Sequence, residues 1–424
     1  MGSDPITIKE KLRLSFYPSL RNLNYMVWIG VIHKLSTVRP RRLVFLDSIR
    51  GLAALAVVWS HFAQGYGSLV PIQKMIENTP LHMFWDGSAA VSMFFVLSGF
   101  VLSLKYLQPL DPVTPSRLRF STFYTSRFCR ISLPFVVILI VSYGGYHWCY
   151  RSLPTEPMAK WPLDFWTSGS LAAASSFPKQ ALLFLPNTTH FYVPQGWTLT
   201  LELQASLCMP FLILVAHRNQ IFLMIICILS IGYDLFLNNN FTVSMYILLY
   251  FHFYLGILLS CYLPVISRWG YEQGLLAKGL LFCLALFFYT FRHTLYVRYP
   301  EMMKEISVWY FTAMGSFLFL VLVLGSTKAR NLLDYAPCRY LGKVSYSLYL
   351  CHLLVLLIPV PLALSFLNHW GLPAGVAHYA AFFLTTLFAL GFSVIFYGSI
   401  EKPAMNLGHR LARIISVPHL ILKE

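Results

Sequence analysis

Ten runs of mostly apolar residues, each about as long as a membrane span, follow one another along the chain. A helix needs roughly 20 such residues to cross the hydrocarbon core of a bilayer. The runs lack the alternation of barrel strands, so all ten are predicted to be helices. They cover residues 44–65, 87–106, 131–149, 198–216, 220–237, 243–263, 275–292, 306–325, 344–366 and 376–399. The pattern predicts an all-α, polytopic membrane protein.

The composition supports this prediction and excludes several other classes of protein. Of the 424 residues, 57% are hydrophobic and 11% are charged, whereas soluble domains carry about 25% charged residues. The eight cysteines include no C-x-x-C pair, and most lie within apolar runs, so they are interpreted as small buried side chains. No P-loop, H-E-x-x-H, G-x-S-x-G or dinucleotide-binding motif is present. We therefore expect no metal and no permanently bound cofactor.

The net charge of +16 requires an explanation in a chain with so few charged residues. It could indicate nucleic acid, acidic lipid, or membrane orientation. With both termini in the cytosol, ten spans place 24 Lys and Arg residues inside and 7 outside, and Arg50 lies within the first span. This distribution is the one that the positive-inside rule predicts. Both termini are thus predicted to be cytosolic, and no nucleic-acid partner is expected.

Three segments follow from this topology. Residues 1–42 are predicted to form a cytosolic arm whose apolar stretch 25–33 is an interfacial amphipathic helix. Residues 43–400 are predicted to form the ten-helix membrane domain, and 401–424 a short cytosolic tail. The outer loop 150–196 is expected to be a lid or a re-entrant segment. Its sequon at Asn187 is a candidate glycosylation site if the loop faces a eukaryotic lumen.

The first span carries Asp47, Arg50 and His61 at membrane depth, where ionisable groups are costly and mark candidate functional sites. Asp47 and Arg50 are three residues apart and can pair on one helix face. Arg50 and His61 are eleven residues apart, which places them within about 20° of the same face and about 16 Å apart along the axis. The alternative is an arginine that reaches the lipid headgroups and a histidine that bonds a neighbour.

Two further spans carry polar groups. Glu202 lies in the fourth span, where it is either a functional carboxylate or one that pairs with a polar neighbour near the span end. In the ninth span, Ser345, Tyr349 and His352 follow an i, i+4, i+7 spacing that places them on one helix face. Such a polar stripe indicates an internal cavity or a hydrogen-bond network.

One short motif conflicts with the membrane prediction. His82, Asp86 and Gly87 match the H-x-x-x-D-G pattern of a superfamily of soluble, two-domain acyltransferases. Ten spans are incompatible with that fold, so the match is interpreted as coincidence.

Six segments together resemble the membrane acyltransferase 3 family, whose members have a core of ten spans. The resemblance runs from about Phe45 to Glu401. Its motifs are the Arg50-to-His61 helix, the 90–100 segment AVSMFFVLSGF, the R-x-x-R of Arg127 and Arg130, the 197–202 segment WTLTLE, the 341–352 segment LGKVSYSLYLCH, and the closing 401–403 EKP. Ser92 stands where many bacterial members have aspartate, and no esterase-like domain follows the last span.

The resemblance implies transfer of an acyl group, most often acetyl, from acyl-CoA to a hydroxyl. His61 is then the candidate general base, or the residue that briefly carries the acyl group. Glu202 would orient the imidazole or position the acceptor, and Arg50 would meet a CoA phosphate or stabilise the oxyanion.

The basic 105–130 loop contributes the remaining candidates for the donor site. Arg127 and Arg130 would bind the nucleotide end of CoA, unless they serve only as topological signals. Ser345, Tyr349 and His352 would line the substrate cavity.

The acceptor is not encoded in these motifs. The resemblance suggests a small natural product of secondary metabolism, a glycolipid or a carbohydrate, modified in an endomembrane or the plasma membrane. A transporter or flippase of a lipid or metabolite is the alternative, because it too would have ten helices with buried polar stripes.

Overall fold

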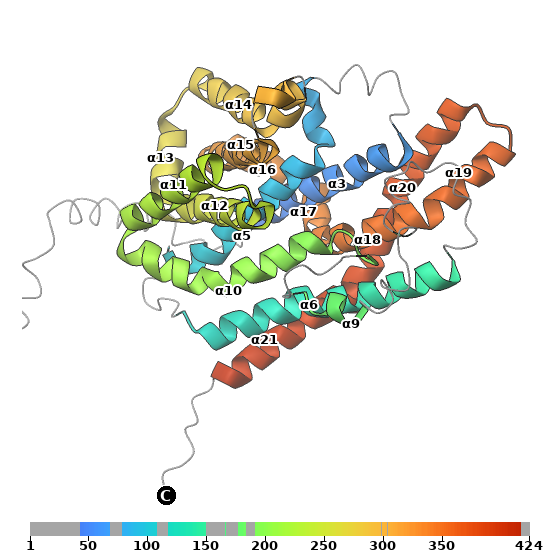
Figure 1. Cartoon of the computed structure of the whole chain (residues 1–424), viewed down its shortest axis with the longest axis horizontal. Coiled ribbons are helices and arrows are strands. Elements are labelled where there is room, and N and C mark those ends of the chain that lie inside the picture. The colour runs from blue at the N-terminus through green and yellow to red at the C-terminus, as the bar shows by residue number, and fades with distance from the viewer. Residues whose placement is uncertain are drawn as a thin grey trace, which may run out of the picture. The chain divides into compact units, whose positions relative to one another are not determined.

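The computed structural model describes residues 43–67, 79–107, 118–149, 166, 177–183, 191–297, 299–302 and 304–416, and every regular element among them is helical. From Phe45 onward these residues form one compact unit (Figure 1). The elements are α3 (Val44–Tyr66), η1 (Pro80–Phe84), α5 (Gly87–Leu107), α6 (Phe120–Trp148), α9 (Phe177–Ala181), α10 (Gly196–Arg218), α11 (Gln220–Phe236), α12 (Phe241–Cys261), α13 (Leu263–Glu272), α14 (Leu275–Tyr289), η3 (Arg292–Tyr296), η4 (Pro300–Met302), α15 (Glu305–Gly325), α16 (Thr327–Leu333), α17 (Ala336–Lys343), α18 (Ser345–Leu357), α19 (Pro359–His369), α20 (Ala374–Phe396), η5 (Tyr397–Glu401) and α21 (Lys402–Ser416).

Each of the ten predicted spans coincides with a helix or a pair of helices. Within the described part of the chain, seven helical segments are long and apolar enough to cross a membrane, and the bent pair α17–α18 makes an eighth. The helices α11 and α14 are apolar but shorter, at 17 and 15 residues. The chain is therefore an all-α, polytopic membrane protein, as the sequence predicts.

Three boundaries differ from the prediction. Helix α6 begins at Phe120, eleven residues before the predicted span, so Arg127 and Arg130 lie on a helix and not in a loop. The ninth span is divided into α18 and α19, because Pro359 begins the second helix and cannot continue the first. The predicted tail is helical through Ser416, and α20, η5 and α21 form one long segment.

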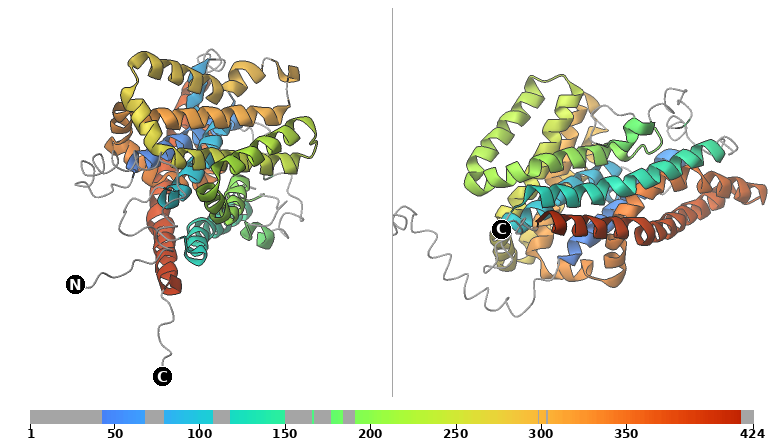
Figure 2. Two further views of the ribbon diagram at one scale, coloured as in Figure 1. Left: turned by 90° about the vertical axis from the view of Figure 1, so that its left-hand side faces the viewer. Right: turned by 90° about the horizontal axis from the view of Figure 1, so that it is seen from below.

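The C-terminal helix α21 lies alongside α6, as both views of Figure 2 show. Gly408 marks the close approach, since a Cβ atom there would lie 2.9 Å from the Cβ of Cys129. This contact joins the end of the chain to the helix that carries Arg127 and Arg130.

The centre of the unit is the crossing of α5 and α12. A Cβ atom at Gly256 would lie 2.4 Å from the backbone of Val96 and Phe100, and one at Gly99 would lie 2.5 Å from the carbonyl of Phe253. Small residues allow helix backbones to approach this closely within a membrane, where packing replaces hydrophobic exclusion. Nearby, Ser103 and Ser260 share a hydrogen bond of 2.6 Å between the two helices.

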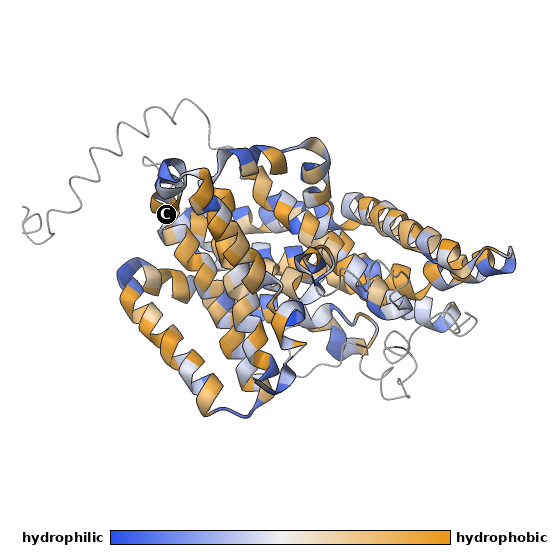
Figure 3. Cartoon of the chain, turned by 90° about the horizontal axis from the view of Figure 1, so that it is seen from above, coloured by the Kyte–Doolittle hydropathy of each residue, from blue (hydrophilic) through white to orange (hydrophobic). Residues whose placement is uncertain are grey.

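Hydrophobic residues predominate along the helices, and hydrophilic residues gather at several helix ends and turns (Figure 3). Helix α11 illustrates this, because Ile221, Ile228 and Leu229 are 60–66% exposed. Such surfaces are expected for helices that face lipid. Asp234, on the same helix, is fully buried and accepts hydrogen bonds from Ser244 and Tyr310.

Candidate active site

Two histidines from distant parts of the sequence meet in the middle of the helical unit. His61 of α3 and His352 of α18 approach to 2.7 Å between Nδ1 of the first ring and Nε2 of the second. Their rings are stacked, with centroids 5.0 Å apart. The pair is enclosed, since His352 is fully buried and His61 partly so.

The hydrogen bonds of His352 assign the tautomer of both rings. Nδ1 of His352 lies 2.7 Å from the carbonyl oxygen of Tyr349. A carbonyl oxygen can only accept a hydrogen bond, so Nδ1 carries a hydrogen and is the donor. In the neutral ring Nε2 then accepts, and Nδ1 of His61 donates to it. The basic lone pair of His61 is consequently on Nε2, the arrangement that an imidazole base requires.

A cavity of about 70 Å³ lies between α3, α5, α6, α10 and α18, and neither His61 nor His352 is among the residues that line it. Its volume is enough for two or three water molecules. Its charged lining consists of three arginines, Arg50, Arg127 and Arg130, and one carboxylate, that of Glu202. The excess of guanidinium groups favours an anionic ligand, and guanidinium groups bind phosphate through two parallel hydrogen bonds.

Glu202 and Arg127 form the buried ion pair of the cavity. Their side chains are 20% and 9% exposed, and Arg127 donates to Oε1 of Glu202 at 2.6 Å. Ser98 also donates to this oxygen, and Nε of Arg127 donates to Ser206. The pair thus neutralises itself, whereas Arg130 has no ion pair among the described residues. Arg50 reaches Asp47 only at 3.8 Å, which confirms the predicted i, i+3 pairing.

Tyr349 connects the cavity to the histidine pair. Its ring lines the cavity, and its hydroxyl shares a 2.6 Å hydrogen bond with Thr198 of α10. Its backbone carbonyl accepts a hydrogen bond from Nδ1 of His352, so Tyr349 contacts both the cavity and the histidine pair. Gln195 donates to the carbonyl of Leu350 at 2.6 Å and joins the start of α10 to the same turn of α18.

Six predicted residues line this one cavity: Arg50, Arg127, Arg130, Glu202, Ser345 and Tyr349. His352, predicted beside them, is not among the lining residues, because its ring turns toward His61 instead. Glu202 bonds Arg127 and Ser98, and His61 bonds His352. The sequon at Asn187 lies outside the described residues.

Other contacts were not evident from the sequence. Thr198 and Ser98 are polar residues within apolar runs, and that feature alone could have marked them, whereas Gln195 lies in the predicted outer loop. Ser347 donates a hydrogen bond to Glu401 at 2.6 Å and so joins α18 to η5. The two residues are 54 positions apart, and helical spacing cannot predict such a contact. Ser92 bonds Thr312 of α15 at 3.0 Å, which gives it a structural partner.

Comparison with known proteins identifies the family. The family profile described as an acyltransferase domain, Acyl_transf_3, matches residues 43–398. The chain is a member of the acyltransferase 3 family. The match covers α3 to α20, and therefore every residue of the cavity and both histidines.

Individual relatives carry related names. Acyltransferase R4 of the fungus Phoma sp. is 22% identical over 91% of this chain and 99% of its own length. Protein 2 in picA locus, of Rhizobium radiobacter, is 32% identical over 39% of the chain and 78% of its own length. Acyltransferase MdmB of Streptomyces mycarofaciens is 40% identical over 22% of each chain. No solved structure matches the chain.

Family membership decides between the two functional classes that the sequence left open. A multi-pass membrane acyltransferase requires an acyl donor and an acyl acceptor, and both must reach the same buried groups. The arginine-lined cavity and the paired histidines both lie within the matched region.

Proposed function

We propose that this protein is an acyl-CoA-dependent O-acyltransferase, and that it transfers an acetyl group to a hydroxyl of a small natural product, glycolipid or carbohydrate. The hydrogen-bonded chain from Tyr349 through His352 to His61 carries the proposal. It sets one imidazole in the tautomer of a general base, next to a cavity rich in arginine. No permanent cofactor is needed for this reaction.

In the proposed reaction, Nε2 of His61 takes the proton of the acceptor hydroxyl as its oxygen attacks the thioester carbonyl. The tetrahedral oxyanion collapses, the C–S bond breaks, and the ester forms. The imidazolium of His61 returns its proton to the departing CoA thiolate, so the enzyme ends unchanged. His352 stabilises the imidazolium through the hydrogen bond that it accepts, as the orienting group of a catalytic triad does.

The donor is proposed to enter from the side of Arg127 and Arg130, with its phosphates against the guanidinium groups. Arg50 belongs to the same cavity and lies eleven residues, or about 16 Å, before His61 on α3. A CoA thioester is a long molecule with its charge at one end and its reactive carbonyl at the other. This separation of anion-binding groups from the proposed base matches that shape.

Release of the CoA thiol tests the proposal. The detergent-purified full chain is incubated with acetyl-CoA and a panel of hydroxylated acceptors, and free thiol is followed with a chromogenic reagent. We expect acceptor-dependent release that His61→Ala lowers by at least 100-fold, within the usual contribution of general-base catalysis. His217→Ala changes an exposed histidine on α10 and serves as the control. Equal activity of His61→Ala and His217→Ala would overturn the role of His61.

The membrane and orientation are part of the same proposal. We place the enzyme as a multi-pass protein in an endomembrane or the plasma membrane, with both termini cytosolic. The excess of basic residues on the predicted cytosolic segments supports this orientation.

A further inference from the structure

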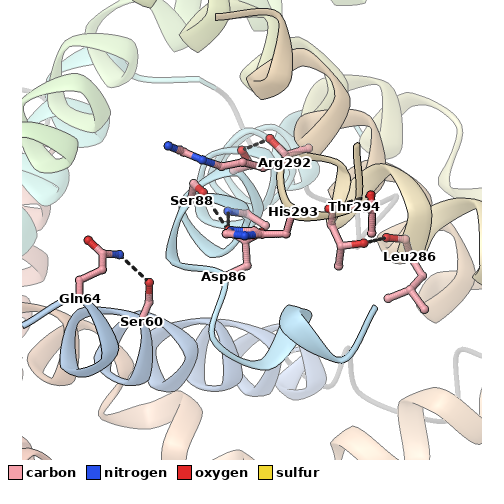
Figure 4. A network of polar contacts seen from close by, with 12 residues as sticks. Ser60, Gln64, Asp86, Ser88, Leu286, Arg292, His293 and Thr294 are labelled. Atoms are coloured by element: carbon pink, nitrogen blue, oxygen red, sulfur yellow. Dashed lines mark hydrogen bonds and ion pairs between the residues drawn. The ribbon is translucent and has the colours of Figure 1, made fainter. Parts of the chain in front are cut away.

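Outside the cavity, three metal-ligating side chains meet near the start of α5. They are His82 of η1, Asp86 immediately before α5, and His293 of η3. One ligand atom of each lies within 4.8 Å of the other two. Figure 4 shows Asp86 and His293 directed toward each other, beside Ser60 and Gln64 of α3. We call these three residues the His-Asp-His cluster.

Buried atoms in this cluster lack partners among the described residues. Nδ1 of His82 and Oδ2 of Asp86 are buried and accept or donate no hydrogen bond there. The two residues are 4% and 1% exposed, so water does not satisfy these atoms at the surface. An unsatisfied polar atom costs roughly 1–3 kcal/mol in a protein interior, and two in one place require an explanation.

The carboxylate of Asp86 is oriented by its other oxygen. Oδ1 accepts from Ser88 at 2.8 Å and from the backbone NH of Ala89 at 2.9 Å, which caps the first turn of α5. Oδ2 therefore points away from the helix, toward Nε2 of His293 at 3.9 Å. That distance is too long for a hydrogen bond. Oδ1 therefore caps the helix, and Oδ2 is left to bind a metal ion.

The two imidazoles converge on the same space. The ring centroids of His82 and His293 are 3.4 Å apart, with 32° between the ring planes. The nearby cation Arg292 is directed to Glu305, at 3.4 Å, and not to Asp86.

We propose that the His-Asp-His cluster binds a divalent transition metal, with zinc as the best fit. Two imidazole nitrogens and one carboxylate oxygen form a common ligand set for zinc, with a fourth position for water. Ligand atoms around tetrahedral zinc are about 3.4 Å apart, so small side-chain rotations from the present spacing complete the site. This proposal does not depend on the proposed acyl transfer.

The bound metal would act as a structural clamp. His82 and Asp86 belong to the connection between α3 and α5, whereas His293 follows α14, more than 200 residues later. The start of α5 touches α3 at Ser60, since a Cβ atom at Gly87 would lie 2.8 Å from its hydroxyl. Ser60 precedes His61, so the metal would hold α14 and α5 against the helix of the proposed base. The sequence analysis expected no metal because no motif such as H-E-x-x-H is present, and His293 lies far along the chain from His82 and Asp86.

Metal content and thermal stability test this site. The full chain, purified in detergent and freed of any affinity tag, is measured by mass spectrometry for metals. We expect about one zinc ion per chain, a lower Tm after treatment with a chelator, and recovery of Tm on adding zinc sulfate. A protein that holds no zinc, and whose Tm responds to neither chelator nor zinc, would overturn the proposal.

Asp86→Asn provides the sharpest variant, because asparagine also caps helices and preserves the fold while it removes the anionic ligand. We expect this variant and His293→Ala to bind zinc at least ~10-fold more weakly than the wild type. His378→Ala changes a half-buried histidine that bonds the carbonyl of Tyr66 and should retain full zinc content. Equal zinc affinity in Asp86→Asn and the wild type would contradict the ligand assignment. Cobalt absorption in the unmutated protein reports the ligand geometry without any variant.

Discussion

At the residue scale, the site depends on pairs that span the sequence. His61 and His352 are 291 residues apart, and Arg127 and Glu202 are 75 apart, yet both pairs are in hydrogen-bond contact. His61, His352 and Glu202 were each recognisable alone as polar groups at membrane depth, and Arg127 as part of a basic loop. The partner of each side chain could not be recognised from the sequence, because helical spacing relates only residues on the same helix.

Replacement of His352 tests its role as the residue that positions His61. His352→Ala should lower kcat by at least ~10-fold and leave KM for acetyl-CoA unchanged, because it removes the acceptor that holds the ring of His61. His352→Gln keeps an oxygen acceptor and should restore part of the activity. A loss of protein stability with an unaltered kcat would instead indicate a purely structural histidine.

Arg130 tests donor binding more cleanly than Arg127, which has Glu202 as a partner. Arg130→Ala should raise KM for acetyl-CoA by about 10-fold, since one charge-assisted hydrogen bond contributes about 1.5–3 kcal/mol. Expression and Tm should not change. Arg218→Ala alters an exposed arginine at the end of α10 and is the control. An equal rise in KM for both variants would point to general electrostatics and not to a site.

The ion pair of Glu202 should matter to stability far more than an exposed pair. Glu202→Gln leaves the buried guanidinium of Arg127 without its counter-charge and should destabilise the protein by about 3–5 kcal/mol. Glu272→Gln breaks the exposed pair with Arg268 and should leave Tm unchanged. Thermal unfolding in detergent compares the two, and similar Tm values would show that the cavity pair is solvated.

At the element scale, close helix crossings hold the site in place. The α5–α12 crossing at Gly99 and Gly256 fixes the helix that carries Ser98, and Gly342 touches the backbone of Asp47 at the start of α3. The ten apolar runs predicted these helices well. The early start of α6 was missed because Arg127 and Arg130 interrupt the apolar run, although they form part of the helix.

The crossing gives a prediction with an internal control. Gly256→Ala places a methyl group 2.4 Å from backbone atoms of α5 and should destabilise the protein by at least ~1–3 kcal/mol. Gly232→Ala, on α11, meets nothing within 4 Å and should be neutral or slightly stabilising. Folded yield after detergent extraction and Tm measure the difference. Equal values for the two variants would rule out a tight crossing.

At the scale of the whole molecule, the distribution of charge predicts the orientation in the membrane. With the predicted topology, a protease added to sealed vesicles should cleave a tag fused to the C-terminus when the cytosolic face is outward. In a eukaryotic host, the gel mobility of the wild type should change on glycosidase treatment, and Asn187→Gln should abolish that change. Protection of the tag, or no glycosidase shift in the wild type, would contradict the predicted orientation.

The sequence by itself determined the helical, membrane-spanning class of the protein and all four charged side chains that line its cavity. Those properties depend on local composition and on the spacing of residues within one helix, as for Arg50 with His61 and for Ser345 with Tyr349. Only the tertiary structure decided which groups touch. In the folded chain His352 bonds His61, Glu202 forms an ion pair with Arg127, and His293 lies close to His82 and Asp86. Such contacts join helices far apart in the chain, and their geometry is set by how those helices pack.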